Sequence, residues 1–180
     1  MKAVLVAGSA RKGGNTDTLC AGVSEALSDE GFDIATFRPY DMEIGHCTNC
    51  GRCRRTGTCV IDDSMSEIYS EIREADVVVM CTPVHFSGVS SILKQVIDRL
   101  QCLWTMPSIP KKRVFGVVAC GGSPQPIFRN IVSVCKAVAN TLGAEWGGEL
   151  TVPGTDAGVS DGRKDDAYTF GIRLAETARS

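Results

Sequence analysis

The sequence predicts an α/β fold with a doubly wound, five-stranded parallel sheet. Apolar, strand-like segments alternate with segments in which apolar residues recur at helical spacing, which is typical of β-α-β units. The strand-like segments are apolar on both faces, as expected when helices cover both sides of a sheet. Right-handed crossovers favour double winding with the order 2-1-3-4-5, which places ligands at the carboxyl ends of strands 1 and 3.

Each element follows from its own local pattern. The expected strands are residues 2–8, 33–37, 76–82 and 113–120 and a fifth, shorter strand at 145–152. The expected helices are one carrying Leu19, Val23, Ala26 and Leu27, one from Asp62-Asp63 to about Ala75, and segments 90–103, 127–142 and 165–178. Asp62 and Asp63 suit a helix amino terminus and are expected to cap the second helix. Residues 40–60 form the one long irregular insert, and inserts of that length are often functional.

Composition bounds the class of protein. A chain of 180 residues with 43% apolar and 22% charged residues fits a single domain, 1–180, with a real core. The net charge of −2 leaves no basic footprint for nucleic acid, and no apolar run is long enough to span a bilayer. The amino terminus lacks the layout of a secretory signal, so a cytoplasmic location is expected. Nine cysteines in such a chain are more typical of metal or redox chemistry than of disulfides.

A glycine-rich loop, residues 8–16, follows the first expected strand and opens the first helix. Glycines let backbone amides close around an anion, and the amino terminus of a helix adds a favourable dipole. Groups in this loop that suit a terminal phosphate are Ser9, Arg11, Gly14, Asn15 and Thr16. The loop matches neither a Walker loop nor the G-x-G-x-x-G dinucleotide fingerprint. A plain strand-to-helix turn with Asn15 as N-cap is the alternative.

Two further loops are expected at the same edge of the sheet. The loop after the third strand contains Thr82, Pro83, Val84, His85 and Phe86. Pro83 stiffens the turn, and His85 and Phe86 are suited to pack beside a planar ring. The loop after the fourth strand contains Cys120, Gly121 and Gly122, where glycines would let the backbone approach a flat ring. The alternatives are ordinary turns, with Phe86 filling a gap in the core.

Four cysteines of the insert have the spacing C-x2-C-x2-C-x5-C: Cys47, Cys50, Cys53 and Cys59. Three cysteines at x2 spacing converge readily on one cubane, as in bacterial ferredoxins, and Gly57 lets the chain fold back toward Cys59. Since there is no second such run in the sequence, one [4Fe–4S] cluster with four ligands is expected. Structural zinc usually draws on two C-x2-C pairs separated by a longer span. Zinc and a loop of free thiols stay as alternatives.

Three arginines lie within the cysteine run, and five further cysteines lie elsewhere in the sequence. Guanidinium groups of Arg52, Arg54 and Arg55 would stabilise a reduced, negatively charged cubane, while a solvated basic turn is the equal alternative. The remaining cysteines are expected to be small buried apolar side chains: Cys20, Cys81, Cys102, Cys120 and Cys135.

Together these residues resemble the NADPH-dependent FMN reductase superfamily and, within it, the iron–sulfur flavoproteins. The matching marks are Gly8-Ser9-x-Arg11-x-x-Gly14-Asn15-Thr16, the cysteine run 47–59, Asp62-Asp63, Ala75-Asp76, Thr82-Pro83-Val84-x-Phe86, and Lys94 to Asp98-Arg99. They cover roughly the first hundred residues. Many relatives have tyrosine where this chain has His85, and beyond residue 123 the match is weak.

The resemblance implies a flavodoxin-like fold that binds FMN, with the phosphate on residues 9–16 and the ring between 82–86 and 119–122. It implies a homodimer or homotetramer whose interface helps cover the flavin, and a [4Fe–4S] cluster near a flavin, including that of a neighbouring subunit. Electrons would pass between the cluster, FMN and an external partner such as ferredoxin, NAD(P)H, a quinone or an oxygen species. Cofactor positioning, with no catalytic acid–base residue, would carry the reaction.

Two other functions stay open on the sequence. One is a cluster-free NAD(P)H:FMN or quinone reductase with a structural cysteine loop. The other is a flavodoxin-like electron carrier that has no substrate of its own.

Overall fold

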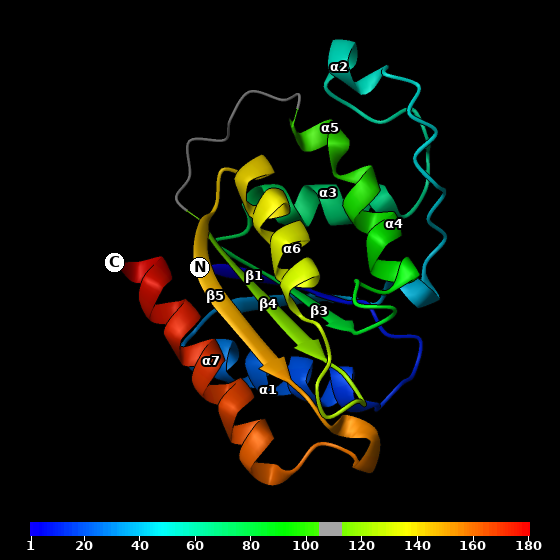
Figure 1. Ribbon diagram of the computed structural model, residues 1–180. Coiled ribbons are helices and arrows are strands. Elements are labelled where there is room, and N and C mark those ends of the chain that lie inside the picture. Colours follow the sequence, from blue (N-terminus) through cyan, green and yellow to red (C-terminus); the bar gives the residue numbers. More distant parts are fainter. Residues whose placement is uncertain (105–112) are drawn as a thin grey trace.

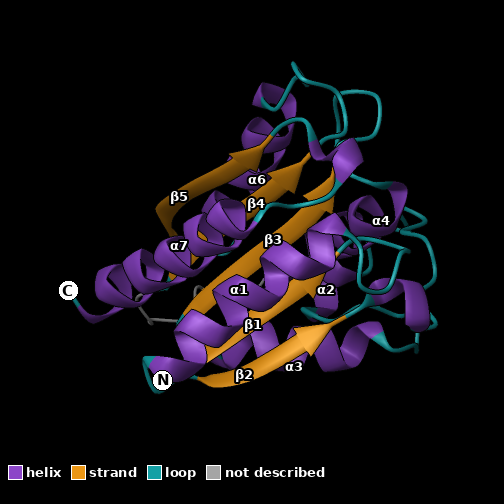
Figure 2. Ribbon diagram, turned by 90° about the horizontal axis from the view of Figure 1, so that it is seen from below, coloured by secondary structure: helices purple, strands orange, loops and turns teal. Residues whose placement is uncertain are grey.

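The computed structural model describes residues 1–104 and 113–180. A five-stranded parallel sheet has the order β2-β1-β3-β4-β5, which Figure 2 shows as five adjacent strands. The strands are β1 (Lys2–Ala7), β2 (Asp33–Phe37), β3 (Val77–Pro83), β4 (Val114–Cys120) and β5 (Glu145–Val152). The predicted doubly wound, flavodoxin-like fold is therefore confirmed.

Helices cover both faces of this sheet (Figure 1). One face carries α1 (Asn15–Asp29) and α7 (Asp161–Arg179), and the other carries α3 (Met65–Glu74), α4 (Ser91–Arg99) and α6 (Arg129–Thr141). Short helices are η1 (Pro39–Asp41), α2 (Cys53–Thr56), α5 (Gln101–Trp104) and η2 (Thr155–Ala157). In the described parts of the chain, no helix is long and apolar enough to cross a membrane.

The three central strands, β1, β3 and β4, are buried on both faces, as the sequence predicts, whereas the edge strands β2 and β5 are partly exposed. In β1, Leu5 packs with the layer of α1 and α7, while Val4 and Val6 pack with the layer of α3, α4 and α6. This alternation is the period of two that a strand imposes. Each such side chain contributes about 1.5–3 kcal/mol on burial, so both helical layers stabilise the sheet.

Two predicted segments contain different elements in the structure. The segment 90–103 is two helices, because the Leu100 N–H bonds both the Val96 and Ile97 carbonyls and the last turn of α4 tightens before α5 begins. Ser90 caps α4 by accepting from the Leu93 N–H at 3.1 Å. The insert 40–60 is not wholly irregular, since it contains α2.

At the carboxyl-terminal end, the last strand has the predicted bounds and the last helix is longer than predicted. β5 spans residues 145–152 as expected, but its eight residues make it the longest strand of the sheet and not a shorter one. A bulge opposite Phe115 and Gly116 absorbs an extra residue, and Gly148 adopts φ +114°. The closing helix begins at Asp161 rather than at residue 165. Acidic residues in a first turn are favourable, which explains why the helix extends this far back.

Asp63 caps α3 from outside the helix. Its Oδ1 accepts from the Met65 N–H at 3.0 Å, while the N-cap residue itself is Ser64, which makes no side-chain cap bond. The predicted capping role is therefore correct for Asp63. Its other oxygen, Oδ2, accepts from the Gly45 N–H and from Arg99 Nη1, both next to the cysteine run.

Gly8 ends β1 at a point of close approach. Its N–H donates to the Cys81 carbonyl at 2.8 Å. A Cβ at Gly8 would lie 2.7 Å from Leu93 Cβ, nearer than side chains pack, so only glycine lets β1 stop against α4. This contact sets where the glycine-rich loop begins.

Candidate functional site: two cavities at opposite ends of helix α4

The first cavity lies at the carboxyl ends of the strands and has a volume of about 330 Å³. We call it the strand-end cavity; it is lined by residues 8–11, 14–16, 83–85, 92, 120–122 and 155–156. It brings together three loops that are far apart in sequence, after β1, β3 and β4. Of the predicted flavin-binding residues, all but Thr82 and Phe86 line it.

The amino terminus of α1 forms one wall of the strand-end cavity. Gly14 is its N-cap and makes no side-chain cap bond, so first-turn amides are left for an anion. Asn15 is the first helical residue rather than the N-cap, and its Nδ2 donates to the Thr155 carbonyl at 2.5 Å. Thr16 is buried, with its Oγ1 3.2 Å from Cys120 Sγ. This wall suits a phosphate.

Asp17 in the first turn would oppose an anion, but its charge is compensated. Its Oδ2 accepts from Arg38 Nη1 at 2.5 Å and from the Gly13 N–H at 2.9 Å. Arg38 Nη2 also donates to the Ser9 carbonyl at 3.4 Å, so it braces the loop from behind. Sequence reasoning missed Arg38, because nothing local links the end of β2 to this loop.

The loop after β3 forms the opposite wall. The Val84 N–H donates to the Cys120 carbonyl at 2.8 Å, and His85 and Gly88 exchange backbone bonds at 3.0 and 2.9 Å. This tight turn holds Phe86 at φ 47° and leaves its side chain fully exposed. The alternative in which Phe86 fills a gap in the core is therefore wrong, and the ring lies outside the cavity lining.

Thr82 has a structural position. It is fully buried, and its Oγ1 accepts from the Ser90 N–H at 3.0 Å. This bond ties the end of β3 to the cap of α4. Thr82 therefore positions the loop instead of facing the cavity.

Three lining residues were not predicted: Ile92, Thr155 and Asp156. A Cβ on residue 122 would lie 1.8 Å from Asp156 Oδ1, so Asp156 can come this close only because residue 122 is glycine. The Thr155 N–H donates to the Gly121 carbonyl at 3.1 Å. The sequence offered one signal for Thr155 and Asp156. Strands 4 and 5 are expected to be neighbours in the sheet, so the loops that follow them lie at the same edge.

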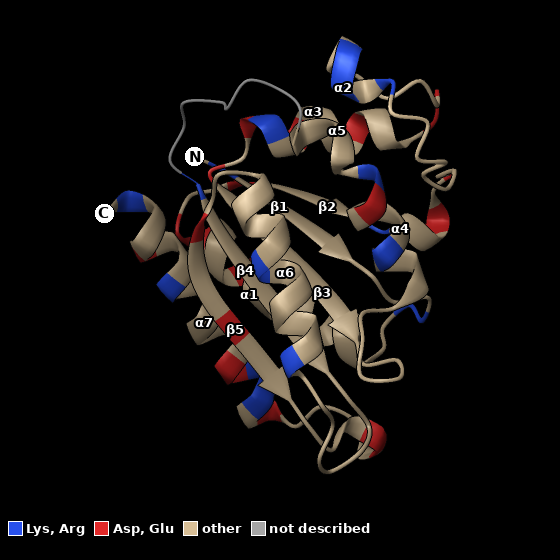
Figure 3. Ribbon diagram, turned by 45° about the horizontal axis from the view of Figure 1, so that its top comes forward, with Lys and Arg blue, Asp and Glu red and all other residues tan. Residues whose placement is uncertain are grey.

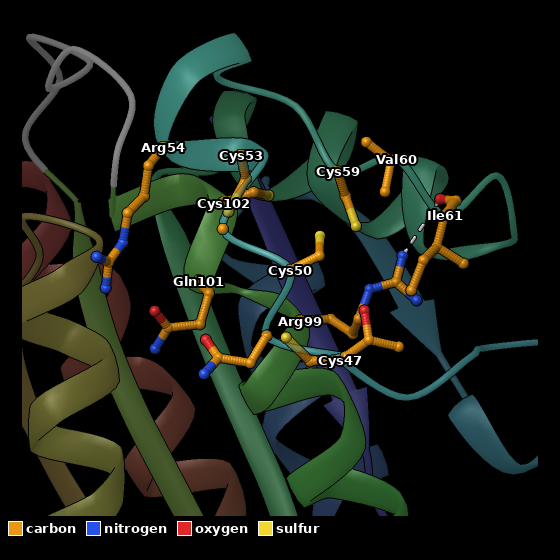
Figure 4. Close-up of a pocket in the computed structure, with 13 residues that line it drawn as sticks. Cys47, Cys50, Cys53, Arg54, Cys59, Val60, Ile61, Arg99, Gln101 and Cys102 are labelled. Atoms are coloured by element: carbon orange, nitrogen blue, oxygen red, sulfur yellow. Dashed lines mark hydrogen bonds between the residues drawn. The ribbon is translucent and has the colours of Figure 1, made fainter.

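The second cavity lies at the other end of α4 (Figure 4). This cysteine cavity measures about 40 Å³ and is lined by residues 47–51, 53–54, 59–61, 99 and 101–102. All four cysteines of the predicted run line it: Cys47, Cys50, Cys53 and Cys59. Ile92 lines the first cavity and Arg99 the second, so about 10 Å of helix rise separates them.

The thiols face one cavity without forming a finished metal site. Within residues 1–104 and 113–180, no three histidine, cysteine or carboxylate side chains are arranged to hold a metal ion. Cys47 and Cys50 are exposed, and Cys53 and Cys59 are half-buried. A hydrogen bond from the Arg52 backbone, with a smaller one from Thr48, holds the pKa of Cys50 below that of an ordinary thiol. The cluster stays a prediction.

Charged side chains frame this loop. Arg54 lines the cysteine cavity, whereas Arg52 and Arg55 do not. Figure 3 shows the basic residues of α2 at the outer tip of the molecule. Of the three arginines, Arg54 lines the cavity and Arg52 bonds Cys50 through its backbone, while Arg55 does not line the cavity.

Cys102 is a fifth cysteine of this cavity. It is buried, as are Cys20, Cys81, Cys120 and Cys135, which confirms the predicted burial of the five isolated cysteines. Burial also raises the pKa of the Cys102 thiol. Its position beside the cysteine run was missed, because it depends on the break between α4 and α5.

Known proteins resemble this chain over most of its length. Residues 1–145 match the family model for NADPH-dependent FMN reductase. An iron–sulfur flavoprotein of Archaeoglobus fulgidus is 30% identical over 182 residues, covering 100% of this chain and 81% of the relative. An iron–sulfur flavoprotein of Methanocaldococcus jannaschii is 35% identical over 123 residues, covering 68% of this chain and only 63% of the relative.

A solved structure supports the fold. The flavodoxin, WrbA-like protein from Agrobacterium tumefaciens superposes with a TM-score of 0.70 at 19% identity, covering 99% of this chain and 97% of that chain. The fold and the strand-end cavity define a flavodoxin-like oxidoreductase of the FMN-dependent class. The chain belongs to the NADPH-dependent FMN reductase family and, within it, to the iron–sulfur flavoproteins. The predicted family and enzyme class are confirmed at this level.

Proposed function

We propose that this protein passes electrons between FMN in the strand-end cavity, a [4Fe–4S] cluster in the cysteine cavity and an external donor or acceptor. The observation that carries the proposal is that Cys47, Cys50, Cys53 and Cys59 line one cavity in a chain of an FMN reductase family. When bound, FMN exchanges a hydride or single electrons, and the cluster exchanges one electron at a time.

The chain's own residues fit FMN at the strand-end cavity. The open amides of α1 and the Arg11 guanidinium would hold the phosphate, because charge-assisted hydrogen bonds to phosphate are the strong ones. Gly121 and Gly122 line the same cavity as the 83–85 loop, and a flat ring would lie between the two. Catalysis would rest on how these residues position the cofactor, and the proposal assigns no residue as a catalytic acid or base.

The donor set also fits a cluster. Thiolates are the ligands that hold cubanes, and the lowered pKa of Cys50 favours its thiolate. Arg54 lines the same cavity, and its charge would offset part of the negative charge of four thiolates. These features favour a cluster over a purely structural cysteine loop.

The two cavities lie at opposite ends of α4, so the cysteine cavity of a chain can lie nearer to the flavin of a neighbouring subunit than to its own. We include in the proposal a homodimer or homotetramer in which the cysteine cavity of one subunit serves the flavin of a neighbour. Ferredoxin and NAD(P)H are the proposed external donors, and a quinone or an oxygen species is the proposed acceptor.

The test is anaerobic reconstitution of Cys50→Ser beside Cys135→Ala, which removes a buried thiol on α6, far from the run. Cys50→Ser should lose iron, sulfide and the broad visible absorption of a cluster, because one of four ligands is gone. It should keep stoichiometric FMN, since no flavin-side residue is touched. Cys135→Ala should keep both cofactors.

Wild-type protein that takes up zinc, or no metal, under these conditions would contradict the cluster. Steady NAD(P)H oxidation by such protein would support the cluster-free reductase, and flavin reduction without turnover would support the electron carrier. Turnover only with a one-electron donor would support the proposal.

A further inference from the structure

Arg99 is a buried cation at the end of α4 with no role in the scheme above. Its side chain is 1% exposed, although arginine is almost never fully buried without partners. It lines the cysteine cavity, and Figure 4 shows it lying between Cys47 and Ile61. A buried guanidinium needs its donors satisfied, so each nitrogen can be traced to a partner.

Two of these partners are the carbonyls that flank the cysteine run. Nη1 donates to the Gly45 carbonyl at 2.8 Å, and Nη2 donates to the Ile61 carbonyl at 3.4 Å. Gly45 precedes Cys47 by two residues, and Ile61 follows Cys59 by two. The guanidinium therefore joins the two ends of the loop that carries all four thiols.

Asp63 completes this closure. Its Oδ2 accepts from Arg99 Nη1 at 2.6 Å and its Oδ1 from Nη2 at 3.0 Å, a bidentate pair. The Gly45 N–H also donates to Asp63 Oδ2, at 2.8 Å. Burial alone would raise the pKa of Asp63, but these hydrogen bonds and that from Met65 outweigh it and lower the pKa.

Nε is the remaining nitrogen of the guanidinium. It is buried and has no hydrogen-bond partner in the part of the chain that the structure describes. A buried, unsatisfied donor costs about 1–3 kcal/mol. The Nε of Arg113 is a second such atom, but Arg113 does not line the cysteine cavity. Because Arg99 lines the cysteine cavity, the group held by the cysteines is the partner in reach.

We propose that Arg99 is a positioning residue that closes the base of the cysteine loop through Gly45, Ile61 and Asp63 and donates its Nε–H to a sulfur atom of the bound cluster. The inference rests on the cluster proposed above. Hydrogen bonds to cluster sulfurs help to set reduction potentials, and a donor stabilises the more negative, reduced state. Arg99 thus links loop geometry to redox potential.

The test compares Arg99→Lys with Arg113→Lys. Lysine keeps the positive charge but lacks Nε–H and the bidentate fork, so a changed potential reports the hydrogen bond rather than the charge. Arg113 is the matched control, because it is equally buried and donates to the carbonyls of Leu142 and Arg73, away from the loop. A double variant, Asp63→Asn with Arg99→Gln, removes both buried charges and serves if Arg99→Lys does not fold.

The first measurement is amide hydrogen exchange in iron-free protein. The Gly45 N–H should exchange at least ~10-fold faster in Arg99→Lys, because the acceptor Asp63 loses its anchor. The second is the midpoint potential of reconstituted protein, which should move to more negative values. A tenfold weaker preference for the reduced cluster corresponds to about 59 mV for a one-electron couple. Arg113→Lys should change neither quantity.

Wild-type exchange and potential in Arg99→Lys would overturn the inference and leave the cluster proposal intact. An equal shift of potential in Arg113→Lys would overturn it too, since the effect would then follow from general loosening. Wild-type protein that binds no iron would remove the cluster and the Nε–H contact together.

Discussion

The strand-end cavity and the cysteine cavity differ in what holds their walls. Backbone bonds between neighbouring loops and strands define the first: Gly8 to Cys81, Val84 to Cys120 and Gly121 to Val152. The second is shaped by an insert without strand pairing, whose base is joined by the side chains of Arg99 and Asp63. One cavity is thus an extension of the sheet, and the other depends on a single buried ion pair.

This difference bears on how each site meets its cofactor. Backbone bonds fix the walls of the strand-end cavity, so little ordering is expected when a ligand binds. The cysteine loop contains Asn49, Gly51 and Gly57 at positive φ and carries two exposed thiols. Ordering such a loop costs about 1–2 kcal/mol per residue, which the bound group has to offset. Disturbing one cavity should therefore leave the other intact.

The largest expected effect is on the strand-end cavity. Arg11→Ala combined with Asn15→Ala should weaken FMN binding by at least on the order of 100-fold, because hydrogen bonds to a charged group contribute about 1.5–3 kcal/mol each. Fluorescence titration of the apoprotein measures the affinity. Iron content after reconstitution should match the wild type. Full FMN occupancy of the purified double variant would show that the phosphate lies elsewhere.

A smaller effect is expected at the base of the cysteine loop. Asp63→Asn should lower the free energy of unfolding by on the order of 3 kcal/mol at pH 7, since it leaves Arg99 buried without its charge partner. Because the pKa of Asp63 is lowered in the folded chain, its contribution is full above the ordinary value of 3.8 and fades as the pH falls below it. Urea denaturation of iron-free protein at several pH values measures this.

Asp98→Asn is the matched control for that experiment. Asp98 pairs with Lys94 at 2.6 Å on the exposed face of α4, where such pairs contribute about 0–1 kcal/mol. Equal losses for the two variants, or a difference that persists below pH 3, would contradict a special role for the buried pair.

The smallest effect on folding is expected at Phe86, beside the strand-end cavity. Phe86→Ser should change the free energy of unfolding by less than about 0.5 kcal/mol, because the ring is fully exposed in the single chain. In a dimer or tetramer that covers the flavin, the same change should weaken self-association. Sedimentation at several concentrations separates the two. A wild-type monomer that retains FMN throughout would exclude the proposed assembly.

Sequence patterns located the elements of the strand-end cavity more fully than those of the cysteine cavity. The glycine-rich loop, the 82–86 segment and the 120–122 turn each follow a recognisable buried strand, so one rule of sheet topology brought them to one edge. Thr82 and Phe86 do not line the cavity, because a residue at the end of a strand or in the turn after it can point into the core, outward or toward a ligand with the same sequence. That choice depends on φ and on neighbouring bonds.

By itself, the sequence determined the strand order, the class of fold, the place of the glycine-rich loop and the four-cysteine run, since periodicity and short motifs are properties of neighbouring residues. Tertiary structure decided that Arg99 bonds Gly45, 54 residues away, and that Cys102 lines the cysteine cavity. It also decided that the two cavities occupy opposite ends of α4. Such contacts arise from how helices and inserts pack on the sheet, and burial couples residues that no local pattern relates.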